Sequence, residues 1–241
     1  MTIQEFSDAF DTLVNSYSSQ ASFGEGASRQ TPTFDEYEKS QFLTLAQEEM
    51  VISLYNGRNT QDDSFESTEE IRRYLSNLIA EKSLEPITNT GGMILGIGSN
   101  SKFFTLDENT WFITYESVKI DKGKCGGSST MRVYPVRQDE YQNIKDNPFR
   151  GVNDRRALRL DLSENNVEII CKYNVTKYYV RYLKRPLPII LIDLPDGLTI
   201  NKKSKAIGCG LHEALHQRIL ERAVMLALQS KGYSVETRKE S

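Results

Sequence analysis

Apolar residues make up 38% of the 241-residue chain and charged residues 26%, which allows one large or two small domains and excludes wholesale disorder. Lys and Arg total 30 and Asp and Glu total 33, so the formal net charge of −3 disfavours a dedicated nucleic-acid binder. The sequence has no run of 18 apolar residues and no apolar segment near its N-terminus, so we expect neither a membrane span nor a secretory signal.

Residues 1–85 predict a helical region. Thr2 and Glu5 form a capping-box pair, in which a hydroxyl and a carboxylate satisfy free backbone N–H groups at a helix start. Apolar residues then follow at helical spacing. Residues 18–33 are rich in Ser, Gly and Gln and predict a flexible linker near the end of this first helix.

A second helix is expected to begin at Thr33 and Glu36, another capping-box pair, and to end at Gly57, where glycine can take a left-handed conformation. Its acidic face, with Glu48 and Glu49, is predicted to meet a neighbouring chain. The residues expected on its buried face are Phe42, Ala46, Met50 and Leu54.

A third helix is predicted from Ser67 and Glu70 to Pro86, where proline ends it. The following region, residues 86–208, is rich in β-branched and aromatic residues separated by turn residues, which predicts an antiparallel meander or a small barrel. Its elements are a hairpin around 107–109, strands near 131–136, 157–162, 167–173, 177–183 and 189–194, and a helical turn near 141–146.

Residues 209–241 predict one helix, about 211–230, closed by Gly232 and followed by a polar tail. Its apolar face is broader than the stripe that a surface helix needs. We therefore expect the second side of this helix, around Ala223, to be covered by a second chain. The fold class is α+β, with N-terminal helices, a central antiparallel β-rich region and one C-terminal helix.

Charge is divided unevenly along the sequence. Residues 1–100 hold 16 acidic and 6 basic residues, and residues 101–241 hold 17 acidic and 24 basic residues. This asymmetry favours two surfaces with different partners or self-association through unlike faces. An ordinary charged helical exterior would produce the same counts, so both interpretations stay open.

The pentapeptide HEALH at 212–216 matches the zincin pattern H-E-x-x-H, in which two histidines one helical turn apart bind Zn²⁺ and the glutamate acts as general base. That chemistry needs a third protein ligand, but His212 and His216 are the only histidines in the chain. The packing interpretation places His216 at the start of the apolar stripe and Glu213 in the first helical turn. A zinc-dependent hydrolase using His212, Glu213 and His216 remains the alternative function.

Three other segments could carry chemistry. The loop at 96–101 begins like a phosphate-binding G-x-G-x-x-G but has serine at the third glycine position and no helix after it. Residues 125–129 contain a cysteine without a local base. Cys125, Cys171 and Cys209 lie far apart and predict free thiols in a reducing compartment.

Residues 172–185 alternate basic and aromatic side chains, which either stack on nucleic acid or form an ordinary sheet surface and subunit contact. The structural interpretation is favoured for this segment. The basic members are Lys172, Lys177, Arg181, Lys184 and Arg185, and the aromatic members are Tyr173, Tyr178, Tyr179 and Tyr182. These patterns together predict a binding or assembly protein rather than an enzyme, with no catalytic residue, cofactor or metal.

Several segments resemble the ring proteins of crAss-like bacteriophages. They are FDEYEKSQFLTLAQEEMV at 34–51, LYNG at 54–57, RPLPIILIDLPDGLTI at 185–200, and Cys209 leading to ILERAVMLAL at 219–228. The resemblance implies a virion structural protein that forms a homo-oligomeric ring of twelve copies in the phage neck. It also implies contact with the portal protein, with other ring and tail proteins, or with both, and passage of double-stranded DNA through the lumen without specific binding. Assembly would take place in the cytoplasm of the bacterial host.

Overall fold

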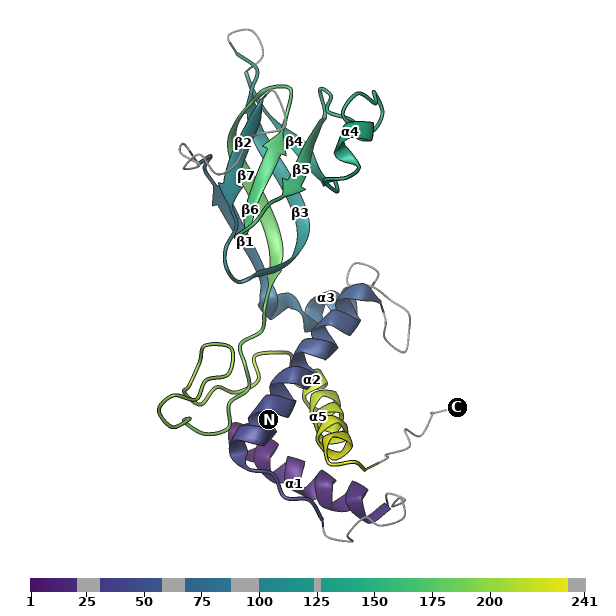
Figure 1. Cartoon of the computed structure of the whole chain (residues 1–241), viewed down its shortest axis with the longest axis vertical. Coiled ribbons are helices and arrows are strands. Elements are labelled where there is room, and N and C mark those ends of the chain that lie inside the picture. The colour runs from purple at the N-terminus through teal and green to yellow at the C-terminus, as the bar shows by residue number, and fades with distance from the viewer. Residues whose placement is uncertain (21–30, 58–67, 88–99, 124–126, 234–241) are drawn as a thin grey trace. The chain divides into compact units, whose positions relative to one another are not determined.

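A computed structural model of the protein describes residues 1–20, 31–57, 68–87, 100–123 and 127–233 (Figure 1). The chain folds into two compact units. Met1–Leu78 and Pro186–Ser241 form the first, here called the helical unit, and Ile79–Arg185 form the second, the sheet unit. Across the described ranges, no helix combines the length and the apolar character needed to cross a membrane.

The helical unit is built around its last helix, which packs against the first two. Fully buried aromatic and aliphatic side chains from all three helices form its core, among them Phe6, Leu43 and Val224. The elements are α1 (Ile3–Gln20), α2 (Glu36–Asn56), α3 (Glu69–Tyr74), short 3₁₀ turns at Ser76–Leu78 and Glu213–Leu215, and α5 (His216–Ser230).

The ends of α1 and α2 show how local sequence sets helix boundaries. The predicted capping box of α1 is confirmed, since the Thr2 N–H donates to Glu5 Oε2 at 2.7 Å and the Glu5 N–H donates to Thr2 Oγ1 at 3.2 Å. The end of α2 is also confirmed, because Gly57 has φ 72° and its N–H donates to the Ser53 carbonyl. The start of α2 lies two residues later than expected, because Asp35 and Glu38 form the capping box.

The buried face of α2 carries polar residues that the apolar pattern did not indicate. Ala46 and Leu54 are buried as predicted, but Phe42 and Met50 are only half-buried. The face of α2 that is buried differs from the predicted one. It includes the polar residues Lys39, Ser40, Thr44 and Gln47, together with Leu43 and Val51.

Three of these polar side chains bind an extended segment that follows Pro186. Thr44 Oγ1 accepts from the Ile189 N–H at 3.1 Å and donates to the Ile189 carbonyl at 3.2 Å. The Leu191 N–H donates to Ser40 Oγ at 3.0 Å, and Gln47 donates to the Leu187 carbonyl at 2.7 Å. A helix face thus supplies the hydrogen bonds that a neighbouring strand would supply in a sheet.

The strand predicted at 189–194 is therefore wrong as a sheet element. It forms only an isolated bridge between Ile190 and Ile207, and residues 186–208, assigned from sequence to the β-rich region, belong to the helical unit. The third helix is also shorter than predicted. It ends at Tyr74, and Ile79–Leu84 form strand β1 because they pair with another strand of the sheet unit.

The sheet unit is a curled sheet of seven strands in the order β1-β7-β3-β4-β5-β6-β2 (Figure 1). The Ile87 N–H, just after β1, donates to the carbonyl of Phe103 in β2 at 2.8 Å. The chain next to one edge strand of the sheet is therefore hydrogen-bonded to the strand at the other edge. Besides β1, the elements are β2 (Ser101–Thr105), β3 (Thr110–Asp121), β4 (Ser128–Pro135), α4 (Tyr141–Ile144), β5 (Arg156–Asp161), β6 (Asn166–Ile170) and β7 (Asn174–Lys184).

The α+β class is confirmed, and the helical turn expected at 141–146 is α4. The expectation of a wholly antiparallel region is wrong at one pair, because β4 and β5 run parallel, with Val133 opposite Ala157. A parallel pair needs a crossover connection, and the segment that contains α4 provides it.

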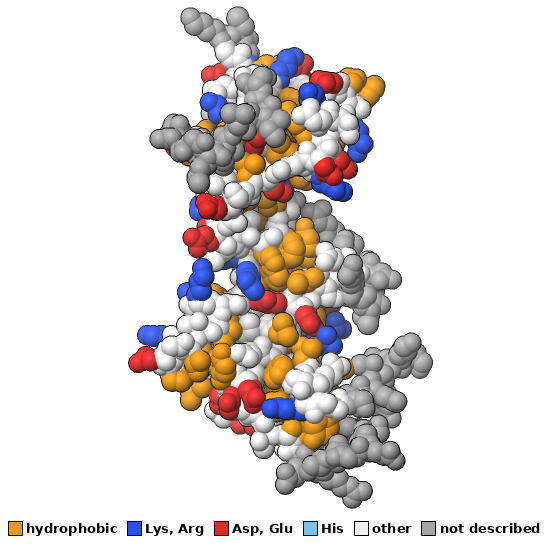
Figure 2. Space-filling view, viewed as in Figure 1, with side chains coloured by type: hydrophobic (Ala, Val, Ile, Leu, Met, Phe, Trp, Pro, Cys, Tyr) orange, Lys and Arg blue, Asp and Glu red, His pale blue; other side chains and the backbone are white. Residues whose placement is uncertain are grey.

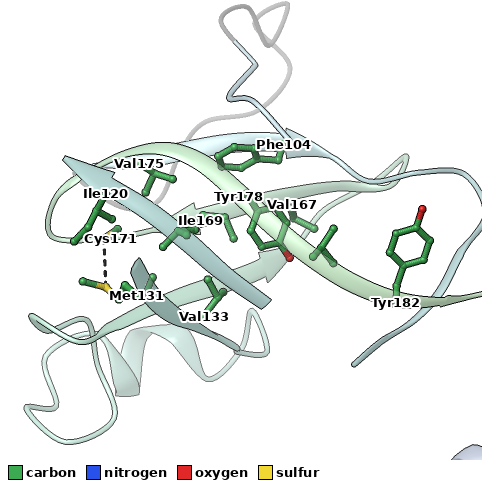
Figure 3. Close-up of a cluster of buried hydrophobic side chains, with 13 residues drawn as sticks. Phe104, Ile120, Met131, Val133, Val167, Ile169, Cys171, Val175, Tyr178 and Tyr182 are labelled. Carbon is green, nitrogen blue, oxygen red and sulfur yellow. Dashed lines mark hydrogen bonds between the residues drawn. The ribbon is translucent and has the colours of Figure 1, made fainter. Parts of the chain in front are cut away.

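The core of the sheet unit lies inside the curl. Figure 3 shows side chains from different strands converging there, with Phe104 and Tyr178 at a ring-centroid distance of 5.3 Å. The Cys171 thiol, predicted free, is buried beside the sulfur of Met131 at 3.7 Å. Burial raises the pKa of this thiol.

The terminal helix is covered by its own chain. Its α-helical part begins at His216, later than expected, and Gly232 with φ 83° follows its end. Ala223, Val224 and Ala227 are fully buried by α1 and α2. The expectation that a second chain covers the side around Ala223 is therefore wrong, because the breadth of the apolar face reflects two partner helices within one unit.

Candidate functional site

The HEALH motif straddles a change of helix type. His212 precedes a 3₁₀ turn and is exposed; its Nδ1 accepts from the Ala214 N–H at 3.3 Å, and its ring lies against Tyr74 at 5.3 Å between centroids. His216 opens α5 and is 5% exposed. The zinc chemistry requires both histidines on one α-helical turn. His212 and His216 do not meet this requirement, because only His216 lies in the α-helix.

Both ring nitrogens of His216 have partners within the chain. Nδ1 lies 2.9 Å from the N-terminal ammonium of Met1, and Nε2 lies 3.1 Å from the Leu211 carbonyl. Since the ammonium donates and the carbonyl accepts, the ring is neutral with its proton on Nε2. Burial lowers the pKa of His216, which favours the same state. The prediction that His216 begins the buried stripe of this helix is confirmed, and its ring lies 5.4 Å from that of Phe6 between centroids.

Within the described ranges, no three His, Cys, Asp or Glu side chains come together in a way that could hold a metal. Glu213 is exposed in the 3₁₀ turn. The arrangement at 212–216 is a helix start that ties the N-terminal residues to α5. It lacks the shared ligand face on which the hydrolase alternative depended.

The basic residues of β7 lie on its outer side together with Tyr179, whereas two of its tyrosines lie on the core side. Tyr178 and Tyr182 point into the core (Figure 3), whereas Arg181 lies outside and binds Glu81 at 2.8 Å. Lys172 binds Asp154 at 2.8 Å. These pairs follow the structural interpretation of the segment, in which cations meet carboxylates across the sheet surface.

A buried ionic cluster that no sequence pattern indicated joins β3, β5 and β7. Glu116 on β3 accepts from Arg159 of β5 at 2.7 Å and from the Tyr178 hydroxyl at 2.7 Å. All three residues are at most 8% exposed. Burial, with the nearby Glu116 charge, raises the pKa of the Tyr178 hydroxyl, so it remains a donor to Glu116.

A surface pocket of about 340 Å³ lies on the outer face of β1, β3 and β7. It is lined by Glu81, Tyr115, Ser117, Tyr179, Val180 and Arg181. Its two charged residues are bound to each other at 2.8 Å, so their charges are mutually satisfied. The sequence indicated Tyr179 and Arg181, but their neighbours come from β1 and β3 and could not be paired with them in advance.

Other predicted segments lie partly or wholly outside the described residues. They are residues 96–99 of the loop at 96–101, Cys125, most of the linker at 18–33, and the polar tail after Tyr233. Ser128 and Ser129 begin β4.

The two units differ in charge. Residues 1–78 and 186–241 carry 20 acidic and 13 basic residues, and residues 79–185 carry 13 acidic and 17 basic residues. The helical unit therefore has a formal charge of −7 and the sheet unit one of +4.

The polar clusters described above bind elements of this chain to one another, as in a structural protein. The chain belongs to the phage tail ring protein 3/4 family, whose model matches residues 1–239. It is 48% identical over 234 residues to Ring protein 3 of Bacteroides phage crAss001, covering 96% of both chains. It is 30% identical over 236 residues to Ring protein 4/5 of the same phage, covering 94% of this chain and 92% of that one. The resemblance to crAss-like phage ring proteins is thereby confirmed.

Proposed function

We propose that this protein is a virion component that forms a closed homo-oligomeric ring of twelve copies in the neck between the capsid portal and the tail. The observation that carries the proposal is the family match over residues 1–239, together with nearly full coverage of Ring protein 3. A match of this extent includes both folding units, so the whole architecture is shared.

The ring would be bounded by the portal protein or by other ring and tail proteins, and its lumen would surround double-stranded DNA. A net charge of −3 suits a channel that DNA crosses without being held by phosphate neutralisation. The proposed role is structural, without catalysis, a cofactor or a membrane partner. Assembly would take place in the host cytoplasm before incorporation into the virion.

The opposite charges of the two units support a ring built from one repeated contact. A head-to-tail interface joins two different patches of neighbouring copies, and such contacts close into a ring when the rotation permits. A unit at −7 and a unit at +4 supply unlike patches of opposite sign.

The test is the mass and shape of the full-length protein, alone and in virions. Native mass spectrometry and electron microscopy should show closed rings of twelve copies, and sections of virions should place them at the neck. Absence of the protein from purified virions would overturn the proposal. Rings of another copy number would correct the stoichiometry alone.

A further inference from the structure

The crossover between β4 and β5 presents an exposed phenylalanine. Phe149 is 83% exposed, more than any other large apolar side chain among the described residues. Figure 2 shows hydrophobic side chains projecting at the edge of the molecule over the α4 region. Isolated exposed leucines are common on protein surfaces, but a fully projecting aromatic side chain is the type of residue that dominates binding energy at interfaces.

The backbone that carries Phe149 is held in one conformation. Asn147 Oδ1 accepts from the N–H groups of Phe149 at 2.9 Å and Arg150 at 3.1 Å, and Arg156 donates to the Phe149 carbonyl at 2.8 Å. Arg156 in turn stacks on Tyr134, 4.3 Å from the ring centroid.

The backbone that follows Phe149 is also closely packed, at Gly151. Gly151 donates to the Asn147 carbonyl at 2.7 Å, and a Cβ at position 151 would come within 2.6 Å of the Ile144 carbonyl oxygen. Only glycine fits such a close approach without displacing the backbone. The loop therefore pays little ordering entropy on binding, which is the property of a preorganised anchor.

The charge around the anchor points to an acidic partner. Residues 145–156 contain four basic residues and two acidic ones, and one of the acidic side chains, Asp154, is already bound to Lys172. Arg150 adjoins Phe149 directly. The complementary surface is apolar and negatively charged.

The helical unit of this chain offers such a surface. Three of its exposed large apolar side chains, Leu187, Ile192 and Leu198, lie on residues 187–198, here called the acceptor segment. That segment has two acidic residues, Asp193 and Asp196, both exposed, and no basic residue, whereas the return of the same loop carries Lys202, Lys203 and Lys205. The negative charge of this loop is therefore confined to 187–198, within a helical unit at −7. Figure 2 shows hydrophobic side chains gathered over the loops after Pro186.

The acceptor segment is also held in place. Its first part is bonded to Thr44 and Gln47 of α2, and Asp193 accepts from the Ala206 N–H at 2.7 Å. The Leu194 N–H donates to the Ser204 carbonyl at 2.7 Å. Leu187, Ile192 and Leu198 therefore remain exposed although the backbone under them is ordered.

We infer that Phe149 of one copy docks on the acceptor segment of a second copy, with Arg150 facing Asp193 and Asp196. The contact is heterologous, joining the sheet unit of one chain to the helical unit of the next. The inference rests on the proposed ring and assigns the surfaces that build it.

The first experiment replaces Phe149 with the photo-crosslinker p-benzoylphenylalanine in full-length protein. Chains carrying ¹⁴N and ¹⁵N are mixed, irradiated and analysed by mass spectrometry. The expected product joins residue 149 of one isotope to a peptide from 187–198 of the other. Products within one isotope only, products at another segment of the chain, or no product would each overturn the inference.

The second experiment measures assembly of variants by sedimentation. Phe149→Ala should weaken self-association about 30-fold, the scale of an interface hot spot, and Ile192→Asp should weaken it similarly. Phe149→Trp should retain assembly because it keeps a large aromatic anchor. Tyr115→Ala, which removes another exposed aromatic side chain of the sheet unit, is the matched control and should assemble normally.

Since Phe149 and Ile192 are both more than half exposed, neither substitution should alter folding, and thermal melts check this. Equal loss with Tyr115→Ala, or rings unchanged by Phe149→Ala, would overturn the inference and leave the proposed ring standing. A wild-type chain that stays monomeric at every concentration and in virions would overturn both.

Discussion

Glu116 is the residue on which the buried charge of the sheet unit depends. Its carboxylate satisfies the Arg159 guanidinium and the Tyr178 hydroxyl, and removing it would leave buried Arg159 with the exposed carboxylate of Asp161 as its ion-pair partner. Buried ionic groups cost little when paired but much when one partner is removed.

Glu116→Ala should therefore lower the free energy of unfolding of the sheet unit by about 3 kcal/mol. Fluorescence of Trp111, the single tryptophan, reports on this unit because it lies on β3. Glu81→Ala, which removes an exposed pair with Arg181, should cost less than about 1 kcal/mol. Similar losses from both variants would contradict this account.

His216 makes the stability of the helical unit dependent on pH. Burial and the adjacent N-terminal ammonium lower its pKa in the folded state, so the unfolded chain binds the proton more readily. Stability contributed by the neutral ring is present above the unfolded pKa of about 6.5 and is lost as the pH falls through and below it.

The melting temperature should therefore fall between pH 7.5 and pH 5.5, as followed by circular dichroism at 222 nm. His216→Gln should show a smaller fall across the same range, although its absolute stability is lower. The exposed His212 offers the control, because His212→Gln should keep the full pH dependence. An undiminished fall in His216→Gln would assign the effect to other groups.

At the scale of elements, α2 has an unusual partner. Ser40, Thr44 and Gln47 occupy one helical face and serve the backbone of the segment after Pro186. Each of these contacts replaces a hydrogen bond to water that the buried backbone has lost. The helix therefore needs polar residues at positions where hydrophobic patterning alone would place leucine.

Thr44→Val keeps the side-chain shape but leaves both the N–H and the carbonyl of Ile189 buried without this partner. We expect a loss of about 2–6 kcal/mol, from about 1–3 kcal/mol for each of the two unsatisfied groups. Thr12→Val on α1, where the hydroxyl is exposed and bonds only the Asp8 carbonyl, should be nearly neutral in the same denaturation experiment. A neutral Thr44→Val would mean that the segment is not held through this residue.

The terminal helix offers a second test at this scale. Ala223 is fully buried where α5 meets α1 and α2, so Ala223→Glu places a carboxylate in the core and should abolish the native circular dichroism of the helical unit. Gln229→Glu introduces the same charge at an exposed position of α5 and should fold normally. A folded, soluble Ala223→Glu monomer would restore the idea of a second chain at this face.

Features that depend on residues close in sequence could be predicted, whereas features that depend on residues distant in sequence could not. The capping box at Thr2, the glycine end at Gly57 and the strands around 167–183 depend on neighbouring residues and were predicted closely. The parallel β4–β5 pair and the conversion of Ile79–Leu84 to a strand depend on distant partners, which periodicity does not reveal. Similarly, the packing of His216 could be predicted from its stripe, whereas the exposure of Phe149 depends on the fold around it.

At the scale of the whole molecule, the sheet unit is an insertion in the helical unit. The chain enters it at Ile79 and leaves it after Arg185, and Ile79 is paired with Leu183 directly across β1 and β7. Insertions with adjacent ends disturb the host fold little, because the ends can be rejoined by a short connection.

Replacing residues 79–185 with a Gly-Ser-Gly linker should therefore leave a helical unit that melts cooperatively at 222 nm. The excised fragment 79–185 should fold separately, with Trp111 fluorescence matching that of the full chain. A helical unit without a cooperative transition would show that it depends on the sheet unit for more than the tie between its two segments.

The pairing of Ile79 with Leu183 has a consequence for the order of folding. In the unfolded chain, Thr44 and Ile189 are 145 residues apart, and closing so long a loop carries an entropic cost that grows with the logarithm of its length. Once β1 and β7 have paired, the effective loop shrinks to roughly 40 residues and its closure becomes easier by about 1 kcal/mol. Prior formation of the sheet should therefore favour docking of the last 56 residues on α2.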